Sequence, residues 1–155
     1  DDLRSGKPCS VSALGGVAGW HGSGHQVSAL RMLLETGLAH NRSAIRTAAA
    51  EEIGYRYRES HPSIDEGAST DVIERLGEAI LHDRCTSVRA VAIASLETVA
   101  SVSSEAEFRR ISELLREASR PEEELRVLSL LRRARDNLDG FLRQLRGLGD
   151  VDAPR

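Results

Sequence analysis

The chain contains few aromatic residues, few cysteines and almost no lysine. Aromatic residues make up 3% of its 155 residues, so a hydrophobic core must be built from leucine, isoleucine, valine and alanine. Small aliphatic side chains suit closely packed helices, and alanine and leucine are strong helix formers. The two cysteines, Cys9 and Cys85, are too few for a disulfide framework, so we expect a reducing, cytoplasmic setting.

Long apolar runs are also absent. No stretch approaches the roughly 18–20 consecutive apolar residues that a transmembrane helix needs, so no membrane partner is expected. The chain opens Asp1-Asp2-Leu3-Arg4, which does not resemble a signal peptide. Because it opens without methionine, we expect a processed piece of a longer protein.

Neither charge sign dominates, since 21 basic residues stand against 24 acidic ones. This balance argues against a general binder of nucleic acid or acidic membranes. All but one of the basic residues are arginines, the exception being Lys7. The codon usage of a GC-rich genome explains this excess. The alternative is a selected anion-binding surface, because arginine forks onto carboxylates and phosphates.

Motifs for catalysis or metal binding are scarce. Zinc needs four nitrogen or sulfur ligands, usually as two close pairs, and the His82–Cys85 pair lies far in sequence from His21 and His25. The glycines between those two histidines match neither a nucleophile elbow nor a phosphate loop. No pair of carboxylates stands out for acid–base catalysis. We therefore predict no catalytic, cofactor-binding or metal-binding residue and no enzyme activity.

What the chain does contain is a recurring pattern. An apolar residue followed by arginine opens an alanine-rich or leucine-rich segment at Ile45, at Val88 and, more loosely, at Leu125. These positions are 43 and 37 residues apart, and a period near 40 with two helices per copy is typical of stacked helical arrays. No segment alternates apolar and polar residues for long enough to predict a strand. The predicted fold is all-α, an α-solenoid of about three helical hairpins in a single domain.

Helical pairs are predicted over 25–59, 70–100 and 104–148. Residues 1–24 are irregular and are interpreted as a degenerate half-repeat, and 149–155 as a frayed tail. Apolar residues three or four positions apart predict the buried stripe of each helix. The stripe residues are Ile45, Ala49, Ile53, Tyr57, Ile73, Leu76, Ile80, Val88, Ala92, Leu96, Phe108, Ile111, Leu115, Leu125, Leu128 and Leu131.

Capping residues predict where these helices begin. Ser104 stands three residues before Glu107, the spacing of a capping box, and Asp71 is the predicted cap of the helix before it. The breakers around 60–69 predict a loop there, and Gly140 predicts an interruption of the last helix.

The pattern resembles HEAT-type repeats over about residues 25–140. In that family the second helix of each pair commonly starts with an apolar–Arg step, and an aspartate often lies six residues before the arginine. Asp83 and Arg89 match this spacing. The resemblance therefore implies a carboxylate–guanidinium contact that locks adjacent repeats, with Arg46 and Arg126 in the same role.

The other two copies depart from the family spacing. Asn41 lies five residues before Arg46, and Arg120 stands where the third copy would carry its aspartate. These departures concern the predicted locking contacts and not the pairing of the helices.

Repeat arrays present extended surfaces formed by equivalent positions of successive helices. The leading interpretation is a non-enzymatic scaffold or adaptor that binds a protein segment on a concave helical surface, and exposed ends of the array would also permit self-association. The positions beside the buried stripe mix charges and sizes, which suits a peptide better than a polyanion. The predicted partner-binding residues are Thr47, Glu51, Arg58, Ala90, Ala94, Glu97, Arg132 and Arg135.

Two alternatives stay open. One is a nucleic-acid-binding or DNA-repair module that uses the arginine-rich last helix, similar to HEAT-like alkylpurine glycosylases. That segment offers only Phe141 for base stacking, which weakens the idea. The other is an accessory subunit similar to the HEAT-like lyases that attach bilin pigments. Only the repeat pattern supports this alternative.

Overall fold

The computed structural model describes residues 23–61, 63–119 and 125–149, with side chains described only between residues 28 and 143. This part of the chain contains helices and no strand, so the all-α prediction is confirmed. The elements are α3 (Ser23–Met32), the short π-helix η1 (Leu33–Gly37), α4 (Ser43–Ser60), α5 (Glu66–His82), α6 (Thr86–Ala100), α7 (Glu105–Ala118) and α8 (Leu125–Gly149). None of these helices is both long and apolar enough to span a membrane.

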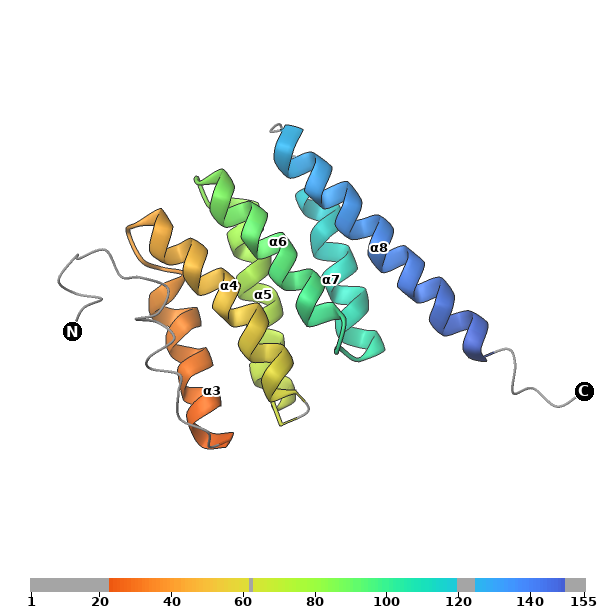
Figure 1. Ribbon diagram of the computed structural model, residues 1–155, viewed down its shortest axis with the longest axis horizontal. Coiled ribbons are helices and arrows are strands. Elements are labelled where there is room, and N and C mark those ends of the chain that lie inside the picture. The colour runs from red at the N-terminus through yellow and green to blue at the C-terminus, as the bar shows by residue number, and fades with distance from the viewer. Residues whose placement is uncertain (1–22, 62, 120–124, 150–155) are drawn as a thin grey trace, which may run out of the picture.

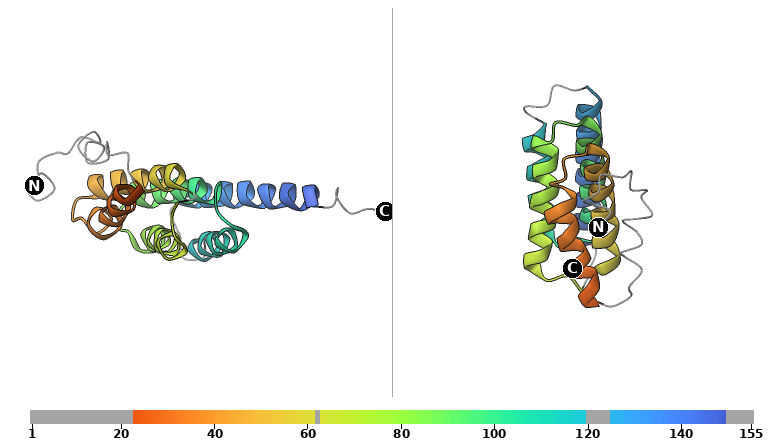
Figure 2. Two further views of the ribbon diagram at one scale, coloured as in Figure 1. Left: turned by 90° about the horizontal axis from the view of Figure 1, so that it is seen from below. Right: turned by 90° about the vertical axis from the view of Figure 1, so that its left-hand side faces the viewer.

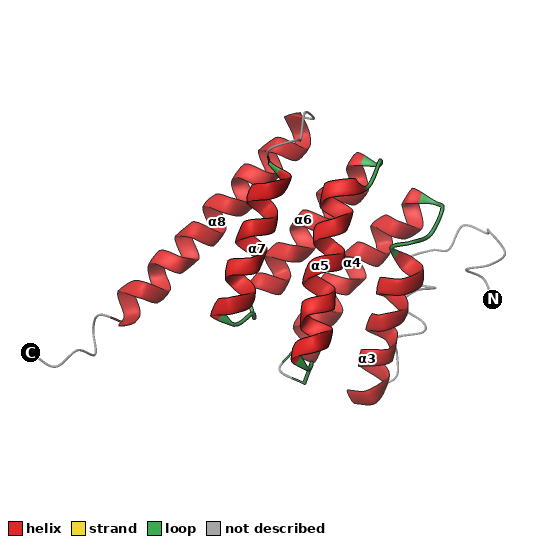
Figure 3. Cartoon of the chain, turned by 180° about the vertical axis from the view of Figure 1, so that it is seen from behind, coloured by secondary structure: helices red, strands yellow, loops and turns green. Residues whose placement is uncertain are grey.

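The helices form two layers (Figures 1 and 2). One layer holds α4, α6 and α8, and the other holds α3, α5 and α7, which lie in front in Figure 3. Neighbours within a layer come from consecutive hairpins, since α4 packs on α6, α6 on α8, and α5 on α7. Helix α6 also packs on α5 and α7 of the other layer, so it lies at the centre of the molecule.

The core fills the space between the layers. Most predicted stripe residues are buried there, which confirms the helical periodicity read from the sequence. Residues with 0% exposure include Ala49, Ile53, Tyr57, Leu76, Val88, Ala92, Leu96, Ile111 and Leu115.

Small residues let α4 and α6 approach closely. A Cβ built on Gly54 would lie 2.9 Å from the Cβ of Ser95, so the two helix backbones are nearly in contact at this point. The Ser95 hydroxyl donates a hydrogen bond of 2.7 Å to the carbonyl of Ala50. This bond satisfies a buried hydroxyl, which would otherwise be costly to bury.

The start of α5 differs from the prediction. The helix begins at Glu66, inside the predicted loop, because the carboxylate of Asp65 accepts a hydrogen bond of 2.9 Å from the Ala68 amide and caps it. Asp71, the predicted cap, is an exposed residue in the body of the helix. The predicted capping box of Ser104 and Glu107 at the start of α7 is confirmed.

Helix α8 also corrects the prediction. It runs without interruption past Gly140, whose Cβ position is open space, so nothing in the packing forces a bend there. Leu125 is 83% exposed and Leu128 is only half-buried, so the predicted stripe is wrong at these two positions, whereas Leu131 is buried as predicted. Its buried stripe is Val127, Leu131, Ala134 and Leu138.

Candidate interaction surface

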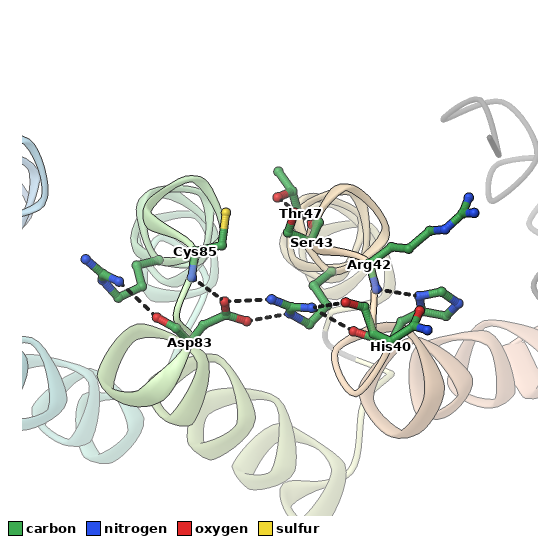
Figure 4. Close-up of polar contacts among 9 residues, drawn as sticks. His40, Arg42, Ser43, Thr47, Asp83 and Cys85 are labelled. Atoms are coloured by element: carbon green, nitrogen blue, oxygen red, sulfur yellow. Dashed lines mark hydrogen bonds and ion pairs between the residues drawn. The ribbon is translucent and has the colours of Figure 1, made fainter. Parts of the chain in front are cut away.

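Two arginines make the same contact in consecutive hairpins (Figure 4). Nη1 of Arg46 donates a hydrogen bond of 2.8 Å to the carbonyl of His40, six residues earlier. Nη1 of Arg89 donates one of 2.9 Å to the carbonyl of Asp83, also six residues earlier. Each bond satisfies a carbonyl in the turn between two helices, where the regular helical partner is missing. The contact therefore fixes how each hairpin turns.

The carboxylate of Asp83 links two hairpins. It accepts bonds of 2.6 and 2.9 Å from Nε and Nη2 of Arg46, although the two residues are 37 positions apart. The resemblance implied a contact with Arg89, which the structure shows through the backbone carbonyl of Asp83, whereas the carboxylate pairs with the preceding hairpin. Such two-point guanidinium–carboxylate pairs fix orientation as well as adding energy.

The electrostatics of Asp83 follow from this placement. Burial acts to raise the pKa of its carboxyl, but hydrogen bonds from Arg46 and from the Cys85 amide, together with the charges of Arg46 and Arg89, hold that pKa below its usual range. The hydrogen bond to Asp83 likewise raises the pKa of Arg46. Both groups are therefore charged at neutral pH.

In the third hairpin the predicted arginine does not stand at the place equivalent to Arg46. Val127 takes the buried place that Ile45 and Val88 take in α4 and α6, so the next residue, Leu128, stands where the other hairpins have their arginine. Arg126 lies on the exposed side of α8. The turn before α8 lies outside the described residues, so the locking role of Arg126 stays a prediction.

All eight predicted partner-binding residues lie in one layer, on α4, α6 and α8. Glu51, Arg58, Ala94 and Arg132 are exposed, whereas the other four, Thr47, Ala90, Glu97 and Arg135, are half-buried.

Several of these side chains already have partners in the chain. Thr47 donates to the carbonyl of Ser43 in its own helix. Glu97 accepts a hydrogen bond of 2.9 Å from Asn137, which joins α6 to α8. The guanidinium of Arg58 lies 5.8 Å from the centre of the Tyr55 ring. These three are consequently less available to a partner than Glu51 or Ala94.

The outward side of α6 carries only small uncharged side chains at its accessible positions. We call Ser87, Ala90, Val91, Ala94 and Thr98 the α6 strip. The two charged residues of this helix point to contacts at its sides, Arg89 to the turn before α6 and Glu97 to α8. The strip is therefore a low surface between the longer side chains of α4 and α8.

The charge differs between the two sides of the strip at one set of equivalent places. Glu51 in α4, Ala94 in α6 and Arg133 in α8 occupy these places, six residues after the first buried stripe residue of each helix. Beyond them both flanking helices expose mixed charges, Arg58 and Glu59 on α4 and arginines together with Asp136 and Asp139 on α8. The sequence analysis missed Val91, Thr98 and Arg133. Applying the repeat period to every exposed position would have found them.

A polar network elsewhere has groups that are common in catalysis. The Tyr57 hydroxyl lies 2.6 Å from the Ser69 hydroxyl, and Ser69 is also hydrogen-bonded to Glu107. Burial raises the pKa of Tyr57. Burial also acts to raise the pKa of Glu107, but hydrogen bonds from Ser69, Ser104 and Tyr57 hold it below its usual range. The Glu107 oxygens are thus occupied in joining α4, α5 and α7, which is a structural role.

No metal site is formed by the part of the chain that the structure describes, since it contains no group of three suitable side chains. Cys9 and His21, which entered the zinc hypothesis, lie outside the described residues. Cys85 is a free thiol at the start of α6. The amides of Val88 and Ser87 lower its pKa because they stabilise the thiolate at the helix N-terminus.

Comparison with family models, curated proteins and solved structures gives no match. The functional argument therefore rests on the contacts and surfaces of this chain.

Proposed function

We propose that this protein is a non-enzymatic interaction module whose α4–α6–α8 layer binds a segment of another protein. The α6 strip is the observation that carries the proposal. The outward side of this central helix carries only Ala, Ser, Thr and Val, with Arg89 and Glu97 engaged in contacts at its sides, which leaves a partner's side chains room to approach the backbone. Its flanking helices supply charged groups for orientation, and such a polar rim around an uncharged centre is common in protein interfaces.

We infer a HEAT-like α-solenoid as the architecture behind this surface. The repeated contact of Arg46 and Arg89 with the turns before them supports this inference. So does the link from Asp83 back to the preceding hairpin. A repeat array offers its equivalent positions as one extended face, which suits an elongated protein segment better than a small molecule.

The charges on either side of the strip set the orientation of the partner. Glu51 lies on the α4 side and Arg133 on the α8 side, at equivalent places. A segment with basic side chains along one edge and acidic ones along the other would match both. The expected partner is therefore an amphipathic segment of mixed charge, with small or apolar residues over Ala94.

Site-specific photo-crosslinking tests this proposal. A benzophenone amino acid at Ala94 is expected to capture a protein from native extract, and the same group at Arg109, an exposed residue of α7, is not. The substitution Ala94→Arg should abolish capture by a second crosslinker at Val91 without altering the circular dichroism spectrum. Equal capture from both positions, or capture that survives Ala94→Arg, would contradict the proposal.

Exposed arginines on α8 are the one observation that favours nucleic acid instead. Arg126, Arg132 and Arg133 are exposed, but so are Asp136 and Asp139 on the same helix. The Phe141 ring stacks on Phe108 with the ring centres 5.7 Å apart, so one of its faces is occupied. Measuring DNA affinity against salt decides this alternative, because phosphate contacts weaken steeply as salt rises.

A further inference from the structure

A groove runs between α3–η1 and α5, on the layer opposite the α6 strip. Two adjoining hollows of about 360 and 270 Å³ form it, and they share Leu34, Glu35 and Arg75. One hollow reaches Asp65 at the start of α5 and the other reaches Asp83 at its end. The groove therefore follows the whole of α5, whose 17 residues span about 25 Å.

The next pair in this layer, α5 and α7, is held together at two points. A Cβ on Gly77 would lie 2.9 Å from Cδ1 of Leu114, so the glycine makes room for that leucine. Arg110 also donates bonds of 2.5 and 2.7 Å to the carboxylate of Glu74. The hollow between these helices is confined to their N-terminal halves.

Equivalent positions explain why α3 and α5 stand further apart. The buried residues Leu30, Leu33, Leu34 and Gly37 recur 43 positions later as Ile73, Leu76, Gly77 and Ile80. The caps Asp65 and Ser104 align α5 with α7 at an offset of 39. Leu34 therefore takes the place of Gly77.

The same alignment puts Arg75 in the place of Leu114. Two long side chains, Leu34 and Arg75, thus replace the glycine and leucine that let α5 and α7 close. Arg31 and Asp71 stand where the Glu74–Arg110 ion pair would be, and among the described residues no ion pair joins α3 to α5. The larger side chains at the place of Gly77 and Leu114 therefore account for the open groove.

Apolar side chains floor the groove and carboxylates dominate its rim. Leu30, Leu34 and Leu38 contribute to the floor from one side and Ala68 and Ala79 from the other.

Part of the rim charge is already neutralised. Arg75 pairs with Glu78 at 3.2 Å in its own helix, and Asp83 pairs with Arg46. Glu35, Asp65 and Asp71 remain against Arg31, so the groove carries net negative charge.

We propose that this groove binds a basic amphipathic helix of another protein. Arg110 and Leu114 of α7 show that a leucine and an arginine four positions apart share one helix face. A partner helix lying over the groove would place such a leucine over Leu34. Its arginines would pair with Glu35 and Asp71 on the two sides of the groove and not lie over Arg31. This surface is separate from the α6 strip, so the two proposals stand or fall independently.

A synthetic helical peptide of about 18 residues, the length of the groove, is the probe. It carries leucine at every third or fourth position with arginines beside them, and a matched peptide carries glutamate in place of arginine. Fluorescence anisotropy with the full chain should show binding of the basic peptide and at least tenfold weaker binding of the acidic one.

Charge reversal then locates the binding site. The double variant Glu35→Arg with Asp71→Arg should lower the affinity for the basic peptide by about tenfold, because like charges would face the peptide. The control double variant Glu51→Arg with Glu59→Arg makes the same charge change at exposed positions of α4. It should leave the affinity for the basic peptide unchanged. A benzophenone placed in the basic peptide should label α3 and α5 of the wild-type protein. No binding of the basic peptide, equal binding of both peptides, equal loss in both double variants, or labelling elsewhere would overturn the proposal.

Discussion

The α4–α6 contact and the α3–α5 contact differ in the size of the residues that face each other. Gly54, Ala50 and Ser95 bring α4 and α6 nearly into backbone contact. Leu34 and Arg75 line an open groove between α3 and α5. The same two consecutive hairpins thus form a closed contact in one layer and an open groove in the other. One or two positions per helix decide where a partner could enter.

Enlarging the closed contact should have the largest effect. The substitution Gly54→Leu forces a side chain into the backbone of Ser95, which already lies 3.0 Å from the Cβ position. We expect a loss of about 3 kcal/mol in the free energy of unfolding, measured by urea denaturation. The matched variant Gly140→Leu, at a helix position with open space around it, should not lose stability. Equal losses would mean that the close approach of α4 and α6 is not what limits residue size.

Overpacking between the layers should cost somewhat less. Ala92 is 0% exposed, so Ala92→Leu should lower the free energy of unfolding by about 2 kcal/mol, and Ala49→Leu should do the same. Thermal melts of both variants check this, with Ala94→Leu on the exposed side of α6 as the control. Unchanged melting temperatures would show that these alanines do not set the layer spacing.

Removing the link between hairpins should have a smaller, pH-dependent effect. Arg46→Met leaves the Asp83 carboxylate without its ion pair, which should cost about 1–2 kcal/mol at neutral pH. Because the pKa of Asp83 is lowered in the folded state, its stabilising contribution is present above the unfolded-state pKa near 4 and is lost as pH falls through the folded-state pKa. The difference between wild type and variant should therefore shrink in acid.

The control for this variant is Arg109→Met, which breaks an exposed pair with Glu105 whose side chains are 70% and 69% exposed. Urea titrations at several pH values should show almost no change for it, because exposed ion pairs contribute little. A pH-independent loss in Arg46→Met would mean that the aliphatic packing of the side chain matters, not its charge.

The smallest effect should be a gain. Gly140→Ala removes a flexible residue from the middle of α8 where no neighbour restricts a methyl group. We expect up to about 1 kcal/mol of added stability from helix propensity, seen as a higher urea midpoint. Gly54→Ala should not show this gain, because its methyl group would meet Ser95.

The sequence was sufficient to predict α4, α6 and α7, because their apolar residues repeat at three and four positions without competing registers. It failed for α8, where a leucine precedes an arginine at Leu125, Leu131, Leu142 and Leu145, so the apolar–Arg step marks no single register. For α5 the sequence indicated Asp71 as the cap, and the hydrogen bond from the Ala68 amide shows that Asp65 caps the helix instead.

The candidate surface was predictable only in part. The residues of α4 and α6 follow from the repeat, whereas the partner of Asp83 does not. Spacing along the chain indicated Arg89, but the carboxylate binds an arginine 37 residues away. The groove beside α5 could not be predicted either, because it depends on which of two helices each side chain faces.

The joint between α4 and α6 should be stiff. Rotating α4 against the turn before α6 must break both bonds from Arg46 to Asp83 at once. Because both oxygen atoms of one carboxylate hold one guanidinium, neither twisting nor sliding of α4 can spare the link. The α4 edge of the α6 strip should therefore keep its position relative to α6 when a partner is bound.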